Sequence, residues 1–236
     1  MTAPRTARER ARTELTREII EAARRRLATE GAAGLSLRAV ARDLEMVSSA
    51  IYRYFPSRDE LLTALIVDGY NALGAAAEAN EPDASNASDY AGRWLALGHA
   101  VRDWAVAHPQ EYALLHGSPV PGYRAPQDTV VPAMRTIQVY GRLISAAHRA
   151  DAVTAPAGVP GPPALLAADA ERVRRVMPGV PDGLALRAVG AWTALFGWIG
   201  FELSGQFEGT LLERRAAFDH HLRCQATLLG LPAAAA

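Results

Sequence analysis

The chain has 236 residues, of which half are hydrophobic, and its formal net charge is zero. A chain of this length forms one large or two modest domains, and its lone cysteine, Cys224, excludes an intrachain disulfide framework. The start is polar with no apolar signal-peptide core, and no run of about 18 uncharged apolar residues occurs, so we expect a cytoplasmic protein without a membrane segment.

The first 13 residues are rich in arginine. Segment 1–13 contains Arg5, Arg8, Arg10 and Arg12 and has the composition of a flexible arm. Charge is unevenly spread: residues 1–60 hold 12 Arg against 9 acids, which leaves 13 Arg against 16 acids in the rest of the chain. We therefore predict a basic N-terminal part on a slightly acidic body.

Two short helical patterns follow, joined by a tight turn. The first places apolar residues on one helical face, at Leu37, Val40, Ala41 and Leu44. Ser36 stands ahead of it as an N-cap, and Glu45 and Met46 fill the turn. The second helix is expected from about Val47 to Tyr54, with inward-facing residues at Val47, Ile51 and Phe55.

The outer face of the second helix has small and polar side chains, at Ser48, Ser49, Ala50, Tyr52 and Arg53. Two helices of this length joined by a short turn match the helix-turn-helix, whose second helix lies in the DNA major groove. Small side chains allow close approach to base edges, and Tyr52 adds a phenol that reaches a phosphate. Pro56 ends the helix and Ser57 caps the next one, where Arg58 is unfavourable for the helix dipole unless an anion lies opposite.

Residues 14–62 resemble the DNA-binding domain of the tetracycline-repressor-like (TetR) family, on the segments TELTREIIEAARRRLATEGAAGLSLRAVARDL and VSSAIYRYFPSRDELL. The resemblance implies a three-helix DNA-binding domain over 14–60 with an interface at Ser36, Arg38, Ser48, Ser49, Ala50, Tyr52, Tyr54 and Arg58. In that family the Arg38 position reaches bases, and the Tyr52 and Arg58 positions hold phosphates. To this set we add Arg53 for its outward position.

Two alternatives stay open for this part of the chain. Segment 35–62 is either a DNA-binding helix-turn-helix or a helical hairpin packed in an all-α protein. The arginine-rich arm either contacts DNA or is a solvated tail. Glu45 departs from the family pattern, which has glycine there, and a left-handed backbone at this position costs about 1 kcal/mol.

The remaining patterns are helical and interrupted by loops. A long helix is expected from Arg58 to about Ala79, a loop over 80–88, and helices over 90–108, 109–116 and 129–149. Segment 151–164 is rich in proline, with four in fourteen positions, so we expect no regular element there. These patterns predict an all-α fold, with residues 61–232 as a helical C-terminal domain.

The last third carries two strong helical patterns, over 184–203 and 211–229. The first is apolar around nearly its whole circumference and so must be covered on all sides. We predict that both pair with their copies in a homodimer. The alternative is an ordinary buried core helix with no partner.

The C-terminal part resembles, more loosely, a domain of many actinobacterial TetR members, on DWAVAHPQEYALLHGSPVPGY and AWTALFGWIGFELSGQFEG. In that family the domain dimerises and binds a small molecule among its middle helices. A mostly apolar pocket with a few polar groups suggests ligand-binding candidates at Trp94, Trp104, Tyr112, His116, Tyr123, Met134, Tyr140 and Trp192. For each residue taken alone, core packing is the alternative.

Catalytic and metal motifs are not evident. The six histidines lack metal-ligand spacing, and His220 with Cys224 supplies two ligands only, so we expect no metal, no cofactor and no enzyme activity. The resemblance to the TetR family implies a ligand-responsive repressor that binds a palindromic operator as a homodimer and is released by a small molecule. The alternative is a helical small-molecule-binding or catalytic protein without DNA binding.

Overall fold

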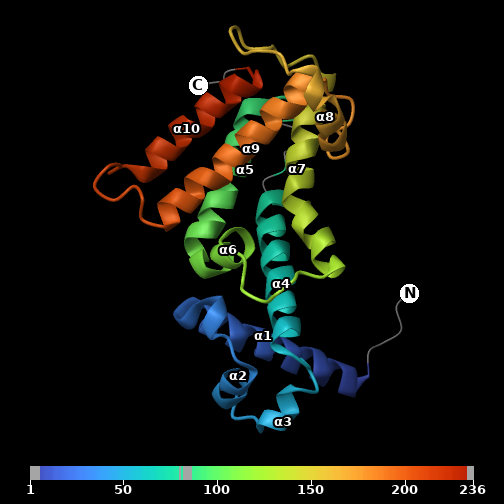
Figure 1. Cartoon of the computed structure of the whole chain (residues 1–236), viewed down its shortest axis with the longest axis vertical. Coiled ribbons are helices and arrows are strands. Elements are labelled where there is room, and N and C mark those ends of the chain that lie inside the picture. The colour runs from blue at the N-terminus through green and yellow to red at the C-terminus, as the bar shows by residue number, and fades with distance from the viewer. Residues whose placement is uncertain (1–5, 80, 82–86, 233–236) are drawn as a thin grey trace. The chain divides into compact units, whose positions relative to one another are not determined.

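A computed structural model describes residues 6–79, 81 and 87–232. Within these ranges the protein has ten α-helices, two short 3-10 turns and no β-strand, which confirms the expected all-α class (Figure 1). The chain forms two compact units: Met1–Asn71 with His108–Pro132, and Ala72–Ala107 with Ala133–Ala236. The predicted boundary near residue 60 therefore differs from the observed division, because segment 108–132 packs with the N-terminal helices.

The first unit is built around the helices predicted at the N-terminus. Its elements are α1 (Ala7–Gly34), α2 (Leu37–Asp43), α3 (Ser48–Ile51), the first part of α4 (Arg58–Glu78), α6 (Pro109–His116) and the 3-10 turn η1 (Gln127–Thr129). The core collects apolar side chains from α1 to α4, among them Ile19, Val40, Ile51, Phe55 and Leu61. Inside α1, Gly31 has a φ of 68°, a kink that glycine adopts without steric cost.

The turn between α2 and α3 is a helix C-cap. The N–H of Met46 donates to the carbonyl of Ala41 at 2.9 Å, and the N–H of Glu45 donates to Arg42 at 3.2 Å. This pair of bonds places Glu45 at the left-handed position, with a φ of 54°. The left-handed backbone considered for this position, where the family has glycine, is thus present.

An ion network joins α6 to the rest of the first unit. Glu111 on α6 is buried, and one of its carboxylate oxygens lies 3.3 Å from Nε of Arg24 on α1. The same guanidinium pairs with Glu21 and with Asp68 of α4. Three carboxylates on three helices therefore converge on one cation, which holds α6 against α1.

The second unit contains the remaining helices. Its elements are the end of α4, α5 (Tyr90–Ala107), α7 (Val130–Arg149) from Ala133 onward, the 3-10 turn η2 (Ala164–Leu166), α8 (Ala167–Val173), α9 (Asp182–Leu203) and α10 (Arg214–Leu229). Trp94 of α5 is fully buried and donates from Nε1 to the carbonyl of Leu222 in α10 at 2.9 Å. The hydroxyl of Tyr140 in α7 donates to Ala188 of α9 at 2.9 Å. These two bonds satisfy the polar atoms of two large core side chains.

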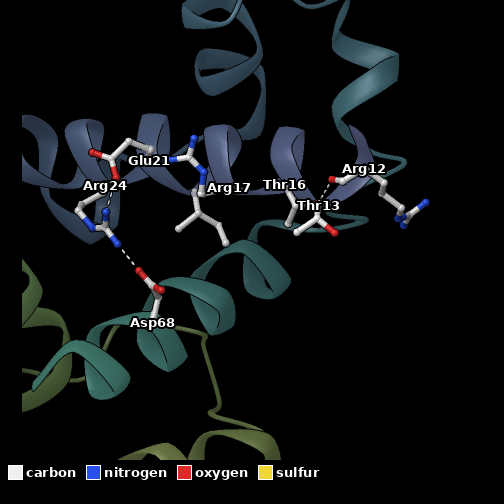
Figure 2. A pocket seen from close by; sticks show the side chains of 8 residues that line it. Arg12, Thr13, Thr16, Arg17, Glu21, Arg24 and Asp68 are labelled. Carbon is white, nitrogen blue, oxygen red and sulfur yellow. Dashed lines mark hydrogen bonds and ion pairs between the residues drawn. The ribbon is translucent and has the colours of Figure 1, made fainter. Parts of the chain in front are cut away.

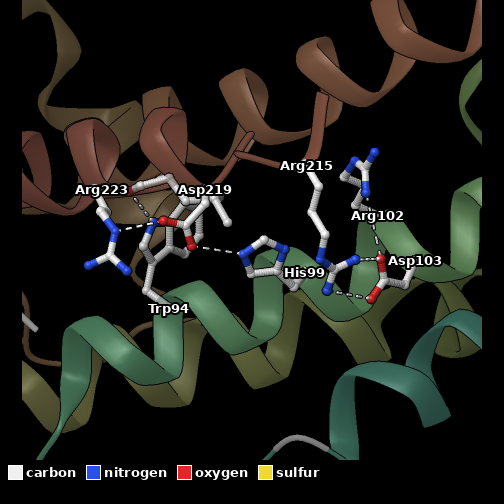
Figure 3. A network of polar contacts seen from close by, with 8 residues as sticks. Trp94, His99, Arg102, Asp103, Arg215, Asp219 and Arg223 are labelled. Atoms are coloured by element: carbon white, nitrogen blue, oxygen red, sulfur yellow. Dashed lines mark hydrogen bonds and ion pairs between the residues drawn. The ribbon is translucent and has the colours of Figure 1, made fainter. Parts of the chain in front are cut away.

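Polar contacts line the junction of α5 with α9 and α10 (Figure 3). Arg102 and Glu202 form a buried two-point ion pair, with Nε to Oε2 at 2.8 Å. Nearer the surface, Asp103 pairs with Arg215 at 2.6 Å. Further along α10, Asp219 accepts from the ring of His99 at 3.1 Å and pairs with Arg223 at 2.7 Å.

Helix α9 leaves one apolar face open within its unit. Leu195 and Ile199 are buried, but Val189 is 40% exposed and Phe201 is 58% exposed. Among the described residues, α9 is the one helix long and apolar enough to cross a membrane, and 33% of its most apolar window is buried. The expectation that α9 is covered on all sides is therefore not met by this unit alone.

The loops differ from expectation in two places. Helix α10 begins at Arg214, three residues later than predicted, and Leu212 is 89% exposed. Residues 151–163 have no regular element, as expected, and η2 begins at the last predicted position, Ala164; the N–H of Thr154 donates to the carbonyl of Gly230 at 2.8 Å. Gly230 ends α10 with a φ of 84°, and a Cβ there would lie 2.0 Å from the carbonyl oxygen of Thr154. Most of the loop predicted over 80–88 lies outside the described residues.

Candidate nucleic-acid interface

Helices α2 and α3 expose mainly polar side chains to solvent. The exposed positions include Ser36 and Arg38 at the start of α2, then Ser48 and Ser49 at the start of α3. Tyr52, just after α3, is 41% exposed. The short side chains bring the backbone at the start of α3 close to the surface, so that a base edge can approach it.

Helix α3, the second helix of the helix-turn-helix and here called the recognition helix, is shorter than its sequence pattern predicts. It covers Ser48–Ile51 and ends in turns through Tyr54. Val47, predicted to face inward, is 71% exposed, because it is the extended N-cap residue and not part of the helix. Met46 packs against the core in its place.

Caps at two helix starts were predicted, and one of them forms. Ser36 occupies the N-cap position of α2 with an extended backbone, but its side chain makes no capping hydrogen bond. Its hydroxyl is therefore not committed to α2. Ser57 does cap α4, since its Oγ accepts from the N–H of Glu60 at 3.2 Å.

Arg58 is half-buried and engaged within the protein. Its Nε donates to the carbonyl of Leu35 at 3.1 Å, and its Nη2 donates to Ala32 at 2.7 Å. These carbonyls lie at the end of α1, where intrahelical partners run out. Arg58 thus fastens the start of α4 to the end of α1, a role that the sequence pattern did not indicate.

The arginine-rich start is helical, contrary to the expected flexible arm. Residues 1–5 lie outside the described part, but α1 begins at Ala7 with a capping box. In it Glu9 N–H donates to Thr6 Oγ1 at 3.2 Å, and the Glu9 carboxylate accepts from Thr6 N–H at 2.7 Å. The density of arginine in this segment is typical of a solvated tail, which concealed the capping box in the sequence.

Arg12 connects this start of α1 to the end of the recognition helix. Its guanidinium carbon lies 5.4 Å from the ring centroid of Tyr54, and its Nη2 donates to the carbonyl of Arg53 at 3.4 Å. Tyr54 is consequently half-buried, while Arg53 stays exposed and Ala50 is half-buried. Arg12 lies outside the predicted interface, and no sequence spacing relates it to α3.

An open groove of about 600 Å³ runs along α1 and reaches α4 (Figure 2). It is lined by Arg12, Thr13, Thr16, Arg17, Ile20, Glu21, Arg24 and Asp68. The lining is polar and the groove is open, so it differs from the enclosed apolar pockets that bind small molecules. A smaller hollow of about 140 Å³ lies between α5 and α10. None of the predicted ligand-binding residues lines either one.

The eight predicted ligand-binding residues divide between the two units. Trp94, Trp104, Met134, Tyr140 and Trp192 belong to the second, and Tyr112, His116 and Tyr123 to the first. Trp94 and Tyr140 are core residues, and Trp192 stacks on Tyr140 with ring centroids 5.1 Å apart. Among the predicted ligand-binding residues of the second unit, Trp192 and Met134 are half-buried and the other three are buried.

In the first unit the predicted ligand residues form two contacts. The rings of Tyr112 and His116 lie 5.0 Å apart, and Tyr112 is buried, which raises its pKa to about 12. The hydroxyl of Tyr123 lies 2.9 Å from that of Thr63. A neutral phenol at Tyr112 is thus present at every physiological pH.

Metal ligands do not gather in the described part of the chain, where no group of three or more His, Cys, Asp or Glu side chains has the geometry to hold an ion. Cys224 Sγ lies 3.6 Å from Nε2 of His220, as their spacing on one helix predicts.

Comparison with known proteins decides the family. Residues 19–65 match the family model described as bacterial regulatory proteins, tetR family, and residues 94–224 match the tetracyclin repressor-like C-terminal domain. The chain belongs to the TetR family. It is 39% identical over 223 residues to the HTH-type transcriptional regulator Rv1816 of Mycobacterium tuberculosis, covering 93% of this chain and 94% of the relative. A regulator of Mycobacterium bovis, Mb1846, shows the same figures.

Two solved structures agree with the fold. Regulatory protein SCO4313 superposes with a TM-score of 0.75 at 35% identity, covering 94% of this chain and all of the other. A protein of unknown function from Rhodococcus sp. RHA1 gives a TM-score of 0.65 at 25% identity, with 89% and 94% coverage. The protein is therefore a DNA-binding transcriptional regulator of the TetR family and not an enzyme, which removes the alternative of a protein without DNA binding.

Proposed function

We propose that this TetR-family protein is a repressor that binds a palindromic operator as a homodimer and is released by a small molecule. The observation that carries the DNA part is the uncommitted polar face of α2 and α3. Arg38 and Tyr52 are exposed on it, and small residues open the start of α3. We assign Arg38, Ser48, Ser49 and Ala50 to base edges, and Ser36, Tyr52, Arg53, Tyr54 and Arg58 to the DNA backbone and its surroundings. Such a protein acts in the cytoplasm, where bacterial chromosomes lie.

The open face of α9 supports the homodimer. Phe201 and Val189 are exposed on this face, and a Cβ added at Gly190 or Gly197 would meet nothing within 4 Å. Small residues let a partner helix approach closely, and burial of exposed apolar area favours association. Helix α10 packs along α9, so the two helices together supply half of a four-helix interface. A two-fold dimer reads two half-sites about 34–36 Å apart, which explains a palindromic operator.

The effector is proposed to be a small, largely apolar molecule. Trp192 is partly exposed beside buried Tyr140, and aromatic walls of this kind suit apolar ligands. Binding that favours the form with low DNA affinity releases the operator by linkage.

The DNA proposal is tested by binding at graded salt. Operator sequences selected from a random library are titrated by fluorescence anisotropy, beside a random duplex of equal length. We expect log affinity to fall linearly with log salt for both. Tyr52→Ala should weaken both duplexes alike, whereas Arg38→Ala should reduce the preference for the operator. Binding that is absent at low salt contradicts the proposal, and equal loss on both duplexes for Arg38→Ala contradicts its assignment to bases.

Arg58 needs a separate test because it has partners in the protein. A phosphate contact requires its guanidinium to leave the carbonyls of Ala32 and Leu35, or to be shared with them. Arg58→Ala should therefore lower the melting temperature as well as DNA affinity, whereas Tyr52→Ala lowers affinity alone. An unchanged melting temperature for Arg58→Ala would show that those carbonyl bonds contribute nothing.

The dimer is tested by mass in solution. Light scattering should give twice the chain mass at micromolar concentration. Phe201→Glu places a charge on the open α9 face and should give monomers. Leu165 is 88% exposed in the turn before α8, so Leu165→Glu is the matched control and should stay dimeric. A wild-type mass of one chain refutes the homodimer.

A further inference from the structure

The first turns of α1 lie beside the end of the recognition helix. Arg12 contacts both the ring of Tyr54 and the carbonyl of Arg53, which places α1 and the exposed Arg53 next to each other. This stretch precedes residues 19–65, which match the family model, and none of it belongs to the interface assigned above. The helix is anchored at this end by its capping box, so the arginines on it have a defined position.

The arginines near α3 are not neutralised by the protein. Within the described part of the chain, Arg8, Arg12 and Arg53 take part in none of the ion pairs that the carboxylates form. Further along α1, by contrast, Arg24 and Arg26 are each paired with two or more carboxylates. Positive charge is therefore offset at Arg24 and Arg26, where α1 packs on other helices, and is not offset at Arg8, Arg12 and Arg53, where α1 meets α3.

Helical spacing places the two unpaired arginines of α1 together. Arg8 and Arg12 are four residues apart and so occupy the same face of α1. Like charges at this spacing repel each other, and an anion between them removes that repulsion. Both side chains are exposed. A partner that carries a row of negative charges can pair with Arg8, Arg12 and Arg53 at the same time.

The charges that line the groove along α1 are distributed in the same way, offset at one end and not at the other (Figure 2). At one end Arg24 meets Glu21 and Asp68, so its charge is offset. At the other end lie Arg12 and Thr13, where no carboxylate lines the groove. The positive end of the groove is the end that adjoins α3.

We propose that Arg8 and Arg12, on the first two turns of α1, bind backbone phosphates of double-stranded DNA beside the DNA major groove in which α3 lies. The inference rests on the proposed function, because α3 must dock on DNA for α1 to reach it. Guanidinium groups bind phosphate through paired, charge-assisted hydrogen bonds. These contacts add affinity without reading sequence, and they position the short α3 on the duplex.

The test compares charge removal at two places on one helix. Arg25 is also exposed and outside the ion pairs, but it lies about 20 Å further along α1 than Arg12, by the rise of about 1.5 Å per residue. Binding to the selected operator and to random DNA is measured from low to high salt for the wild type, Arg8→Gln/Arg12→Gln and Arg25→Gln. Each lost phosphate contact lowers the log–log salt slope by about 0.9, so the double variant should lose about 1.8 per bound chain. Arg25→Gln should keep the wild-type slope.

Two further variants separate charge from folding. Arg8→Lys/Arg12→Lys keeps both cations and should restore most of the slope. Arg12→Gln also removes the contact with Tyr54, so Arg8→Gln alone, which leaves that contact intact, should still lower the slope by about 0.9. Melting temperatures of all variants check that α1 stays folded.

The outcomes distinguish this inference from the proposed function. If the Arg8→Gln and double variants keep the wild-type slope while Tyr52→Ala weakens binding, the α1 contact is overturned and the DNA-binding proposal stands. If the double variant loses affinity for the operator but not for random DNA, phosphate contact is likewise overturned. A wild-type protein that binds neither duplex refutes the proposed function itself.

Discussion

Removing one member of the buried Arg102–Glu202 pair should destabilise the protein strongly. Both side chains are almost fully buried, at 9% and 6% exposure, and the pair joins α5 to α9. Glu202→Gln keeps the shape but leaves the buried guanidinium of Arg102 with only the longer contact of 3.7 Å to the half-exposed carboxylate of Asp103. Breaking a buried pair in this way costs about 3–5 kcal/mol. For a protein of this size each kcal/mol corresponds to about 2–4 °C, so the melting temperature should fall by about 6–20 °C.

A neighbouring ion pair is the natural control. Asp103 and Arg215 are 49% and 62% exposed, so solvent screens their attraction. Arg215→Gln breaks this exposed pair while Asp103 stays beside Arg102, and it should therefore cost less than about 1 kcal/mol. A third variant, Arg102→Met/Glu202→Met, removes both charges and leaves apolar side chains beside Phe218, whose ring Arg102 now covers at 5.5 Å. It should recover most of the stability lost in Glu202→Gln.

The assay is thermal and urea unfolding at one fixed protein concentration, because the homodimer proposed above would make stability depend on concentration. The reasoning fails if Glu202→Gln loses less than about 1 kcal/mol, which is the range of an exposed pair. It also fails if the double methionine variant is as unstable as the single one. Either result means that burial does not determine the strength of this contact.

Three further predictions concern backbone and pH. Glu45→Gly should stabilise the protein by about 0.5–1 kcal/mol in urea unfolding, because glycine accepts the left-handed turn; a loss of stability contradicts the strain argument. Gly230→Ala should lower the free energy of unfolding by at least about 2 kcal/mol, since the added Cβ meets Thr154. Gly209→Ala, with a positive φ but open space around it, should lower it by about 1 kcal/mol. Equal losses for the two variants rule out the close approach at Gly230. The hydrogen bond from His99 and the pair with Arg223 hold the pKa of Asp219 below its ordinary value of 3.8, so its contribution is present above that value and lost as pH falls through the lowered pKa. Melting below pH 4 should thus depend less steeply on pH in Asp219→Asn, and parallel curves contradict this.

Some features of the protein follow from local sequence alone. The helices over α4, α5, α7 and α9 begin and end close to the predicted residues, because apolar periodicity, prolines and glycines act within a few residues of the chain. The left-handed turn at Glu45 and the Ser57 cap are local as well. The family resemblance depended on the same local motif and is confirmed by the match over 19–65.

Other features depend on residues far apart in sequence. Arg58 was predicted to bind a DNA phosphate. The fold brings the end of α1 next to it, and its guanidinium donates hydrogen bonds to backbone carbonyls there. Val47 faces solvent because the tertiary turn makes it a cap residue, although its spacing suited a helix. The helical start of α1 gains a partner in Tyr54, more than 40 residues away.

The helical class, the recognition motif and the family follow from the amino-acid sequence, since each depends on side chains that interact with close neighbours. Which charges are neutralised and which remain available depends on how the helices pack in three dimensions. Trp94 and Tyr140 became core residues, and Arg12 was placed beside α3, through contacts that no spacing along the chain contains. Burial and pairing are properties of packing, so they appear only when distant helices meet.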